Sequence, residues 1–149
     1  MSYTITSDCV GCGACLKLCP VEAIQGESKM THHIDPQKCI ECGSCGRICN
    51  FHAVLDQGQQ VCQQIKRSDW GKPSIDLRTC IGCVLCVQAC PVSCLELQLV
   101  IRGCKTKFPV LTRIDDCLGC GFCAEICPVE AVELRPVIKN KLSPILPLT

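Results

Sequence analysis

The stretch CIECGSCGRICN, residues 39–50, decides how this chain folds. Two, two and three residues separate its four cysteines, and the chain repeats this spacing three more times. The other copies are CVGCGACLKLCP (9–20), CIGCVLCVQACP (80–91) and CLGCGFCAEICP (117–128). These three copies end in Pro, whereas the copy at 39–50 ends in Asn50. Four copies of one cysteine block indicate four related structural units.

The composition shows that cysteine must contribute to the stability of the fold. Of 149 residues, 19 are Cys, while aromatic residues make up only 3%. Because large side chains supply most of the burial that stabilises a core, a conventional core has little material here. Two modules of about half this length would each fall in the size range where metals or disulfides usually compensate.

Three interpretations of the cysteines compete. Disulfides require an oxidising compartment, but the start MSYTIT lacks the features of a secretory signal, and the cysteine total of 19 is odd. Zinc sites expect Cys-x-x-Cys pairs separated by a longer gap. Iron–sulfur sites expect C-x2-C-x2-C-x3-C-P, and all four blocks have this cysteine spacing. The spacing favours iron–sulfur clusters over zinc and disulfides, which stay open as alternatives.

The repeats divide into two modules. The widest gap between blocks follows the second one, and it is polar with Gly and Pro, which is typical of a linker. We therefore expect a first module at 1–56, a linker at 57–72, a second module at 73–135 and a tail at 136–149.

Each repeat predicts a short strand, a cysteine loop, a helical turn around the last two cysteines and an outgoing strand. Ile-Asp precedes three blocks, at Ile34, Ile75 and Ile114, and Ile5 takes the same place before the first block. In the second module LELQLVI (95–101) alternates like a strand and FPVLTRI (108–114) returns antiparallel to it. The first module repeats this hairpin more briefly around Gly26.

These blocks resemble those of bacterial two-[4Fe-4S] ferredoxins, and the whole chain resembles a small polyferredoxin. The resemblance covers residues 5–56 and 73–135. It implies an α+β fold of two tandem ferredoxin-like modules, in which small β-hairpins and short helices surround four [4Fe-4S] clusters. It also implies a role in passing single electrons.

In two-cluster ferredoxins the fourth cysteine of each run binds the other cluster. The resemblance therefore implies four ligand sets: Cys9, Cys12, Cys15 and Cys49 for cluster 1; Cys39, Cys42, Cys45 and Cys19 for cluster 2; Cys80, Cys83, Cys86 and Cys127 for cluster 3; Cys117, Cys120, Cys123 and Cys90 for cluster 4. Glycines between the ligands are expected to adopt unusual dihedral angles, namely Gly11, Gly13, Gly43, Gly82, Gly119 and Gly121.

Asn50 and three further cysteines stand outside this pattern. Asn50 restores an N–H where the other blocks have Pro, and hydrogen bonds to cluster sulfurs raise the reduction potential. One hypothesis is that Asn50 makes cluster 1 less reducing, and the alternative is a tolerated substitution. For Cys62, Cys94 and Cys104, inert or packing thiols are favoured over ligands.

No catalytic motif stands out, so we expect an electron carrier rather than an enzyme. The partners would be a catalytic oxidoreductase subunit and a second redox protein. The Trp70–Pro73 junction resembles the small iron–sulfur subunit of tungsten-dependent aldehyde oxidoreductases; hydrogenases, formate dehydrogenases and CO dehydrogenases carry similar subunits. Alternatives are a free polyferredoxin shuttle, a zinc-bound scaffold, and a sensor, which normally needs an output domain. End-to-end assembly of chains would extend the series of clusters along which electrons pass, although nothing in the residues demands it.

Charge and hydropathy bear on the binding partners and the cellular compartment of the chain. Lys and Arg total 15 against 14 Asp and Glu, whereas free shuttles are usually strongly acidic. No basic stripe interleaved with aromatics suggests nucleic-acid binding, and no stretch approaches the roughly 20 apolar residues of a membrane span. Thiolate-rich sites point to a reducing cytoplasm. The apolar tail RPVIKNKLSPILPLT (135–149) is expected to lie along a partner subunit.

Overall fold

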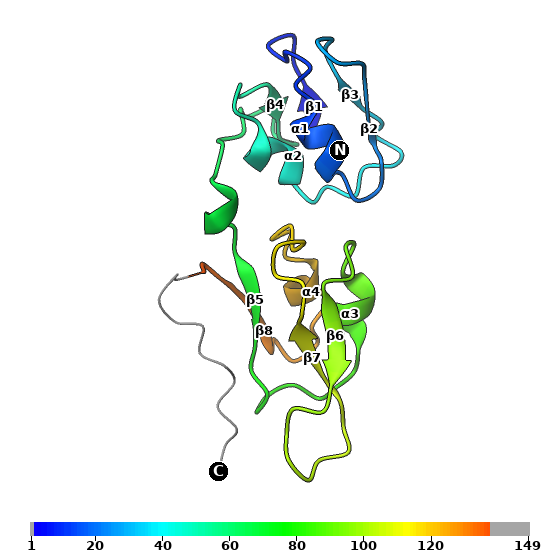
Figure 1. Ribbon diagram of the computed structural model, residues 1–149, viewed down its shortest axis with the longest axis vertical. Coiled ribbons are helices and arrows are strands. Elements are labelled where there is room, and N and C mark those ends of the chain that lie inside the picture. The colour runs from blue at the N-terminus through cyan, green and yellow to red at the C-terminus, as the bar shows by residue number, and fades with distance from the viewer. Residues whose placement is uncertain (1, 138–149) are drawn as a thin grey trace. The chain divides into compact units, whose positions relative to one another are not determined.

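The computed structural model describes residues 2–137, which form two compact units dividing between Asp69 and Trp70 (Figure 1). This division lies within the predicted linker, 57–72. The tail predicted at 136–149 lies outside the described residues from position 138 onward. No helix within 2–137 has the length and apolar character needed to cross a membrane.

Unit 1 contains two short helices and two pairs of antiparallel strands. The first strand pairs with the last, and the two inner strands pair with each other. In chain order the elements are β1 (Thr4–Ile5), α1 (Ala14–Leu18), β2 (Ile24–Gln25), β3 (His33–Ile34), α2 (Ser44–Ile48) and β4 (Val54–Leu55). Helix α1 packs against α2, so the two cysteine blocks meet in the middle of the unit.

Unit 2 repeats this arrangement with longer strands (Figure 1). Strand β5 pairs with β8, and β6 pairs with β7, which confirms the predicted second hairpin. After the 3-10 turn η1 (Arg67–Asp69), the elements are β5 (Lys72–Ile75), α3 (Leu85–Ala89), β6 (Leu95–Gln98), β7 (Phe108–Leu111), α4 (Phe122–Glu125) and β8 (Val132–Arg135). Short helices and antiparallel strand pairs confirm the predicted α+β class.

The strand register defines which residues are equivalent in the four repeats. Ile5 pairs with Val54, Ile34 with Ile24, Ile75 with Val132, and Leu111 with Leu95. The predicted equivalence of Ile114 was therefore wrong, because Leu111 takes that place. Ile114 follows the strand in the turn before Cys117 and is 39% exposed. The number of residues between the strand and the first cysteine differs among the repeats. Aligning the repeats on their cysteines therefore assigned the wrong strand residue.

Asp35 and Asp76 explain why Asp follows Ile in two of the repeats. A side-chain oxygen of Asp35 accepts the N–H of Gln37 at 2.9 Å, and Asp76 accepts that of Arg78 at 3.0 Å. Such turns let a short polar side chain replace a backbone hydrogen bond. They redirect the chain from the strand into the cysteine loop.

The apolar core of each unit includes cysteines. In unit 1 Cys45 is buried with Ile24 and Val54. In unit 2 Cys86 and Cys123 are buried with Leu95 and Val132. Because the same residues form the core and surround the predicted sites, whatever binds the cysteines also supports the fold.

Much of the predicted linker packs against unit 1. Cys62 donates its N–H to Val54 O at 2.8 Å, and Ile65 donates to Arg47 O at 2.9 Å. On the other side of the division, Trp70 is buried, with 2% of its surface exposed. The structured parts of 57–72 are thus shared between the two units.

Candidate iron–sulfur sites

Four cysteine-lined cavities lie in the two units, two in each. Each is lined by three cysteines of one block and the fourth cysteine of the other block in the same unit. We name each cavity after the first cysteine of the block that supplies three: the Cys9 cavity (Cys9, Cys12, Cys15, Cys49), the Cys39 cavity (Cys39, Cys42, Cys45, Cys19), the Cys80 cavity (Cys80, Cys83, Cys86, Cys127) and the Cys117 cavity (Cys117, Cys120, Cys123, Cys90).

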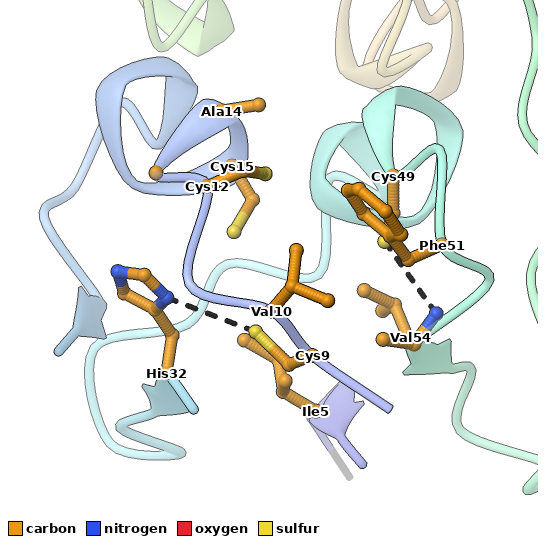
Figure 2. A pocket seen from close by; sticks show the side chains of 12 residues that line it. Ile5, Cys9, Val10, Cys12, Ala14, Cys15, His32, Cys49, Phe51 and Val54 are labelled. Atoms are coloured by element: carbon orange, nitrogen blue, oxygen red, sulfur yellow. Dashed lines mark hydrogen bonds between the residues drawn. The ribbon is translucent and has the colours of Figure 1, made fainter. Parts of the chain in front are cut away.

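The helices explain how one block serves two cavities. In the first repeat Cys15 lies within α1, while Cys19 directly follows the helix as an extended residue. Cys45 and Cys49 have the same places relative to α2. Figure 2 shows Cys49 across the Cys9 cavity from the loop that carries Cys9 and Cys12. One helical turn therefore separates a ligand of one cavity from a ligand of the other.

The cysteine loops depend on left-handed backbone conformations. All six predicted glycines have φ between +62° and +85°. Two positions of this kind lack glycine: Glu41 has φ +61° in the second loop and Val84 has φ +72° in the third. Such conformations aim successive cysteines at one cavity, which confirms the expected role of the loop glycines.

In each block, a backbone N–H group donates a hydrogen bond to the sulfur of the fourth cysteine. The donor is in each case the residue four positions later: Ala23 to Cys19 at 3.3 Å, Ala53 to Cys49 at 3.4 Å, Cys94 to Cys90 at 3.4 Å and Ala131 to Cys127 at 3.2 Å. Hydrogen bonds of this kind stabilise negative charge on the sulfur. The four sites share this donor, so it does not distinguish one from another.

Burial keeps several cysteines protonated in the metal-free chain. Burial, followed by the charge of neighbouring cysteines, raises the pKa of Cys15 to about 11 and that of Cys45 and Cys123 to about 12. Since iron binds the thiolate, positively charged metal must displace these protons. The cavities thus suit a cationic group that neutralises four thiolates together.

The four cysteines of each cavity can be compared with the needs of zinc and of an iron–sulfur cluster. Within residues 2–137 no three Cys, His, Asp or Glu side chains converge on a position for one metal ion. Tetrahedral zinc draws four ligands to about 2.3 Å from a single atom, whereas a [4Fe-4S] cluster is held by four cysteines around a larger core. Four cysteines arranged around a cavity fit the four-iron cluster.

The three further cysteines lie in different surroundings. Cys94 is buried, and its Sγ lies 3.4 Å from Cys90 Sγ beside the Cys117 cavity. A hydrogen bond with Cys117, together with burial, raises the pKa of Cys94 and so keeps it a thiol. Cys62 packs against Gly46, and Cys104 is half-buried near the tip of the β6–β7 hairpin. The packing role favoured for Cys94 agrees with these contacts.

The polar residues near the cavities that the sequence analysis missed include Ser44, His32 and Lys72, and Ser44 Oγ lies 3.2 Å from Cys42 Sγ. His32, only 2% exposed, lines the Cys9 cavity with Nδ1 3.8 Å from Cys9 Sγ (Figure 2). Lys72 is buried, and its Nζ donates to Cys117 O at 2.7 Å. An alignment of the repeats on their strands would have identified His32. His32 precedes the core-facing Ile34 by two residues, as Tyr3 precedes Ile5.

Asn50, the predicted potential-tuning residue, has an exposed side chain. The N–H that reaches Cys49 Sγ belongs to Ala53. An effect of Asn50 on cluster 1 stays a prediction.

Comparison with known proteins assigns both units to one type of domain. Residues 7–53 and residues 73–134 each match a family model described as a 4Fe-4S dicluster domain. No curated protein matches the chain significantly. One similar solved structure is a chain of the formate dehydrogenase - heterodisulfide reductase - formylmethanofuran dehydrogenase complex from Methanospirillum hungatei. The two share 20% identity with a TM-score of 0.42, over 91% of this chain and 53% of that one.

The fold and the four cysteine-lined cavities define an iron–sulfur protein of the electron-carrier class. The chain contains two tandem 4Fe-4S dicluster ferredoxin domains. Two dicluster domains imply four [4Fe-4S] clusters.

Proposed function

We propose that this chain is the electron-transfer subunit of an oxidoreductase complex, with its clusters bound by the four ligand sets given above. The observation that carries the proposal is the composition of the cavities. Each contains three cysteines of one block and the fourth of its neighbour, which is the crossed pattern expected for two-cluster ferredoxins.

A [4Fe-4S] cluster supplies reversible one-electron transfer when bound. The cysteines hold it, the N–H groups of Ala23, Ala53, Cys94 and Ala131 stabilise the sulfur charge, and apolar neighbours limit the access of water. In the Cys9 cavity these neighbours include Ile5 and Val54. Potential is tuned by such hydrogen bonds and by solvent exposure.

One cavity in each unit has a cysteine at the surface. Cys12 and Cys83 are exposed, and the aliphatic residues Val10 and Ile81 beside them are 47% and 60% exposed. Electrons enter or leave most readily where a ligand is near the surface, and exposed apolar side chains favour contact with another protein. The Cys9 and Cys80 cavities are therefore the proposed contact points for the two redox partners.

The resemblance of the Trp70–Pro73 junction supports the choice of partner. It makes a tungsten-dependent aldehyde oxidoreductase the first candidate, in a reducing cytoplasm. Hydrogenases, formate dehydrogenases and CO dehydrogenases are the alternatives. Trp70 and Lys72 are buried and support unit 2, so the junction also has a structural role. A free polyferredoxin shuttle is the second candidate function.

Metal analysis of the protein, purified without oxygen from its native host with its bound proteins, tests the proposal. We expect about sixteen irons per chain, from four clusters of four irons. Tungsten, molybdenum or nickel in a co-purified chain would identify the enzyme. Iron without a partner chain would favour the shuttle, and zinc in place of iron would exclude electron transfer.

A further inference from the structure

One position in each repeat covers a cavity, and its residue differs between the units. It lies two residues before the core-facing strand residues Ile5, Ile34, Ile75 and Leu111. The four residues are Tyr3 at the Cys39 cavity, His32 at the Cys9 cavity, Pro73 at the Cys117 cavity and Pro109 at the Cys80 cavity. The repeat therefore compares four side chains in one structural role.

The chemistry of these residues separates the two units. In unit 2, Pro73 and Pro109 have no side-chain donor and no N–H. In unit 1, Tyr3 and His32 carry polar hydrogens. The His32 side chain reaches a ligand sulfur, with Nδ1 3.8 Å from Cys9 Sγ.

The surroundings of His32 hold its ring against this sulfur. The pairing of Gln25 with His33 positions the backbone beside it. Across the hairpin, a Cβ on Gly26 would lie 2.5 Å from Cδ2 of the His32 ring, so the absent side chain makes room for the imidazole. On the same segment, Thr31 Oγ1 donates to Cys9 O at 3.5 Å. Residues 31 and 32 together contact the first cysteine of the cavity.

We propose that His32 donates its Nδ1–H to the Cys9 thiolate and thereby raises the reduction potential of cluster 1. An iron-bound thiolate carries no proton, so it accepts and the imidazole donates. A hydrogen bond to the sulfur favours the more negative, reduced state. This inference rests on the proposed ligand sets.

A pair of His32 variants tests the donor. His32→Phe keeps a planar ring without a donor, whereas His32→Asn places an amide N–H near the position of Nδ1. His33→Phe is the matched control, because His33 is the exposed neighbour on β3. The measurement is a redox titration of the complete four-cluster protein, followed by electron paramagnetic resonance.

In the unchanged protein we expect four one-electron components, and His32→Phe lowers the potential of one of them, cluster 1. A tenfold decrease in the equilibrium constant for one-electron reduction lowers the reduction potential by about 59 mV. His32→Asn retains most of the original potential, and His33→Phe changes none. In [15N]histidine-labelled protein poised to reduce the component that His32→Phe shifts, electron spin echo spectra show a histidine nitrogen, which His32→Asn abolishes.

The outcomes separate this inference from the proposed function. A protein without iron–sulfur signals contradicts the proposed function itself. If the four reduction potentials are unchanged in His32→Phe, the donor role alone is overturned. The same holds if His32→Phe and His32→Asn lower the potential equally. Should His32→Phe fail to assemble its clusters, Gly26→Ala provides the second test, since the added Cβ displaces the imidazole. The potential of one component then falls, and four unchanged potentials overturn the inference.

Discussion

Val84 adopts a backbone conformation that glycine takes in the other three cysteine loops. Its φ is +72°, against +77° for Gly13, +73° for Gly43 and +85° for Gly121. A left-handed conformation costs an L-residue roughly 1–2 kcal/mol, and a β-branched side chain makes it rarer still. The third loop therefore keeps its shape against a local penalty, which the surrounding fold must offset.

Replacing this residue removes the penalty. We expect Val84→Gly to stabilise unit 2 by up to about 1 kcal/mol, because glycine's greater freedom in the unfolded chain offsets part of the gain. The measurement is the half-life of the cluster absorbance in denaturant, since loss of clusters is irreversible. Gly13→Val is the control: no atom lies within 4 Å of the added Cβ, so the dihedral penalty dominates there. A longer half-life for Gly13→Val would contradict this explanation.

Asn50 gives a second prediction at this scale. In Asn50→Pro the backbone N–H and the amide beside Cys49 are lost, so we expect the potential of cluster 1 to fall. The same titration that resolves the His32 variants measures it. Cys49 Sγ keeps its hydrogen bond from Ala53, at 3.4 Å, so the shift should be smaller than that of His32→Phe. Unchanged potentials would show that Asn50 is a tolerated substitution.

Among the elements, α2 has a requirement that its own sequence does not reveal. Gly46 lies within this helix, where glycine is usually destabilising by roughly 0.5–1 kcal/mol relative to Ala. Here a Cβ on Gly46 would lie 2.6 Å from both Cβ and Sγ of Cys62. The segment around Cys62 therefore packs directly on the helix, and glycine is what permits the contact.

We accordingly expect Gly46→Ala to destabilise unit 1 by about 1–3 kcal/mol, the usual cost of overpacking, despite the better helix propensity of Ala. The displaced segment should become more accessible to trypsin at Lys66 and Arg67. The double variant Gly46→Ala with Cys62→Gly removes the clashing atoms and should recover most of the stability. Cleavage kinetics and thermal denaturation measure both effects. If the double variant is no more stable than Gly46→Ala, the contact with Cys62 is not the cause.

The elements also show what the sequence predicted and what it did not. Cysteine spacing and strand alternation were sufficient for the two dicluster domains and for the β6–β7 hairpin, because these patterns are local. The contact of His32 with Cys9 depends on the β2–β3 register and on the space at Gly26, which join separate segments. The misplaced Ile114 has a similar origin, since a variable turn length changes the distance from strand to cysteine without changing the strand pairing.

For the whole molecule, the crossed cavities predict that each unit gains or loses its clusters together. Cys49 comes from the second block but lines the Cys9 cavity, and Cys19 comes from the first block but lines the Cys39 cavity. A bound cluster in either cavity ties the two halves of unit 1 to each other. Unit 2 is a separate compact unit with its own cysteines, so it should be independent of that event.

Cys49→Ala tests this coupling. If one cluster supports the folding of its neighbour, the variant should lose both clusters of unit 1 and retain those of unit 2, which leaves about half of the iron. Iron and sulfide analysis of the complete chain gives the number. Cys62→Ala, which removes a thiol that lines none of the four cavities described, should keep all the iron. About three quarters of the iron in Cys49→Ala would mean that the clusters are bound independently. Loss of nearly all of it would mean that the two units fold as one.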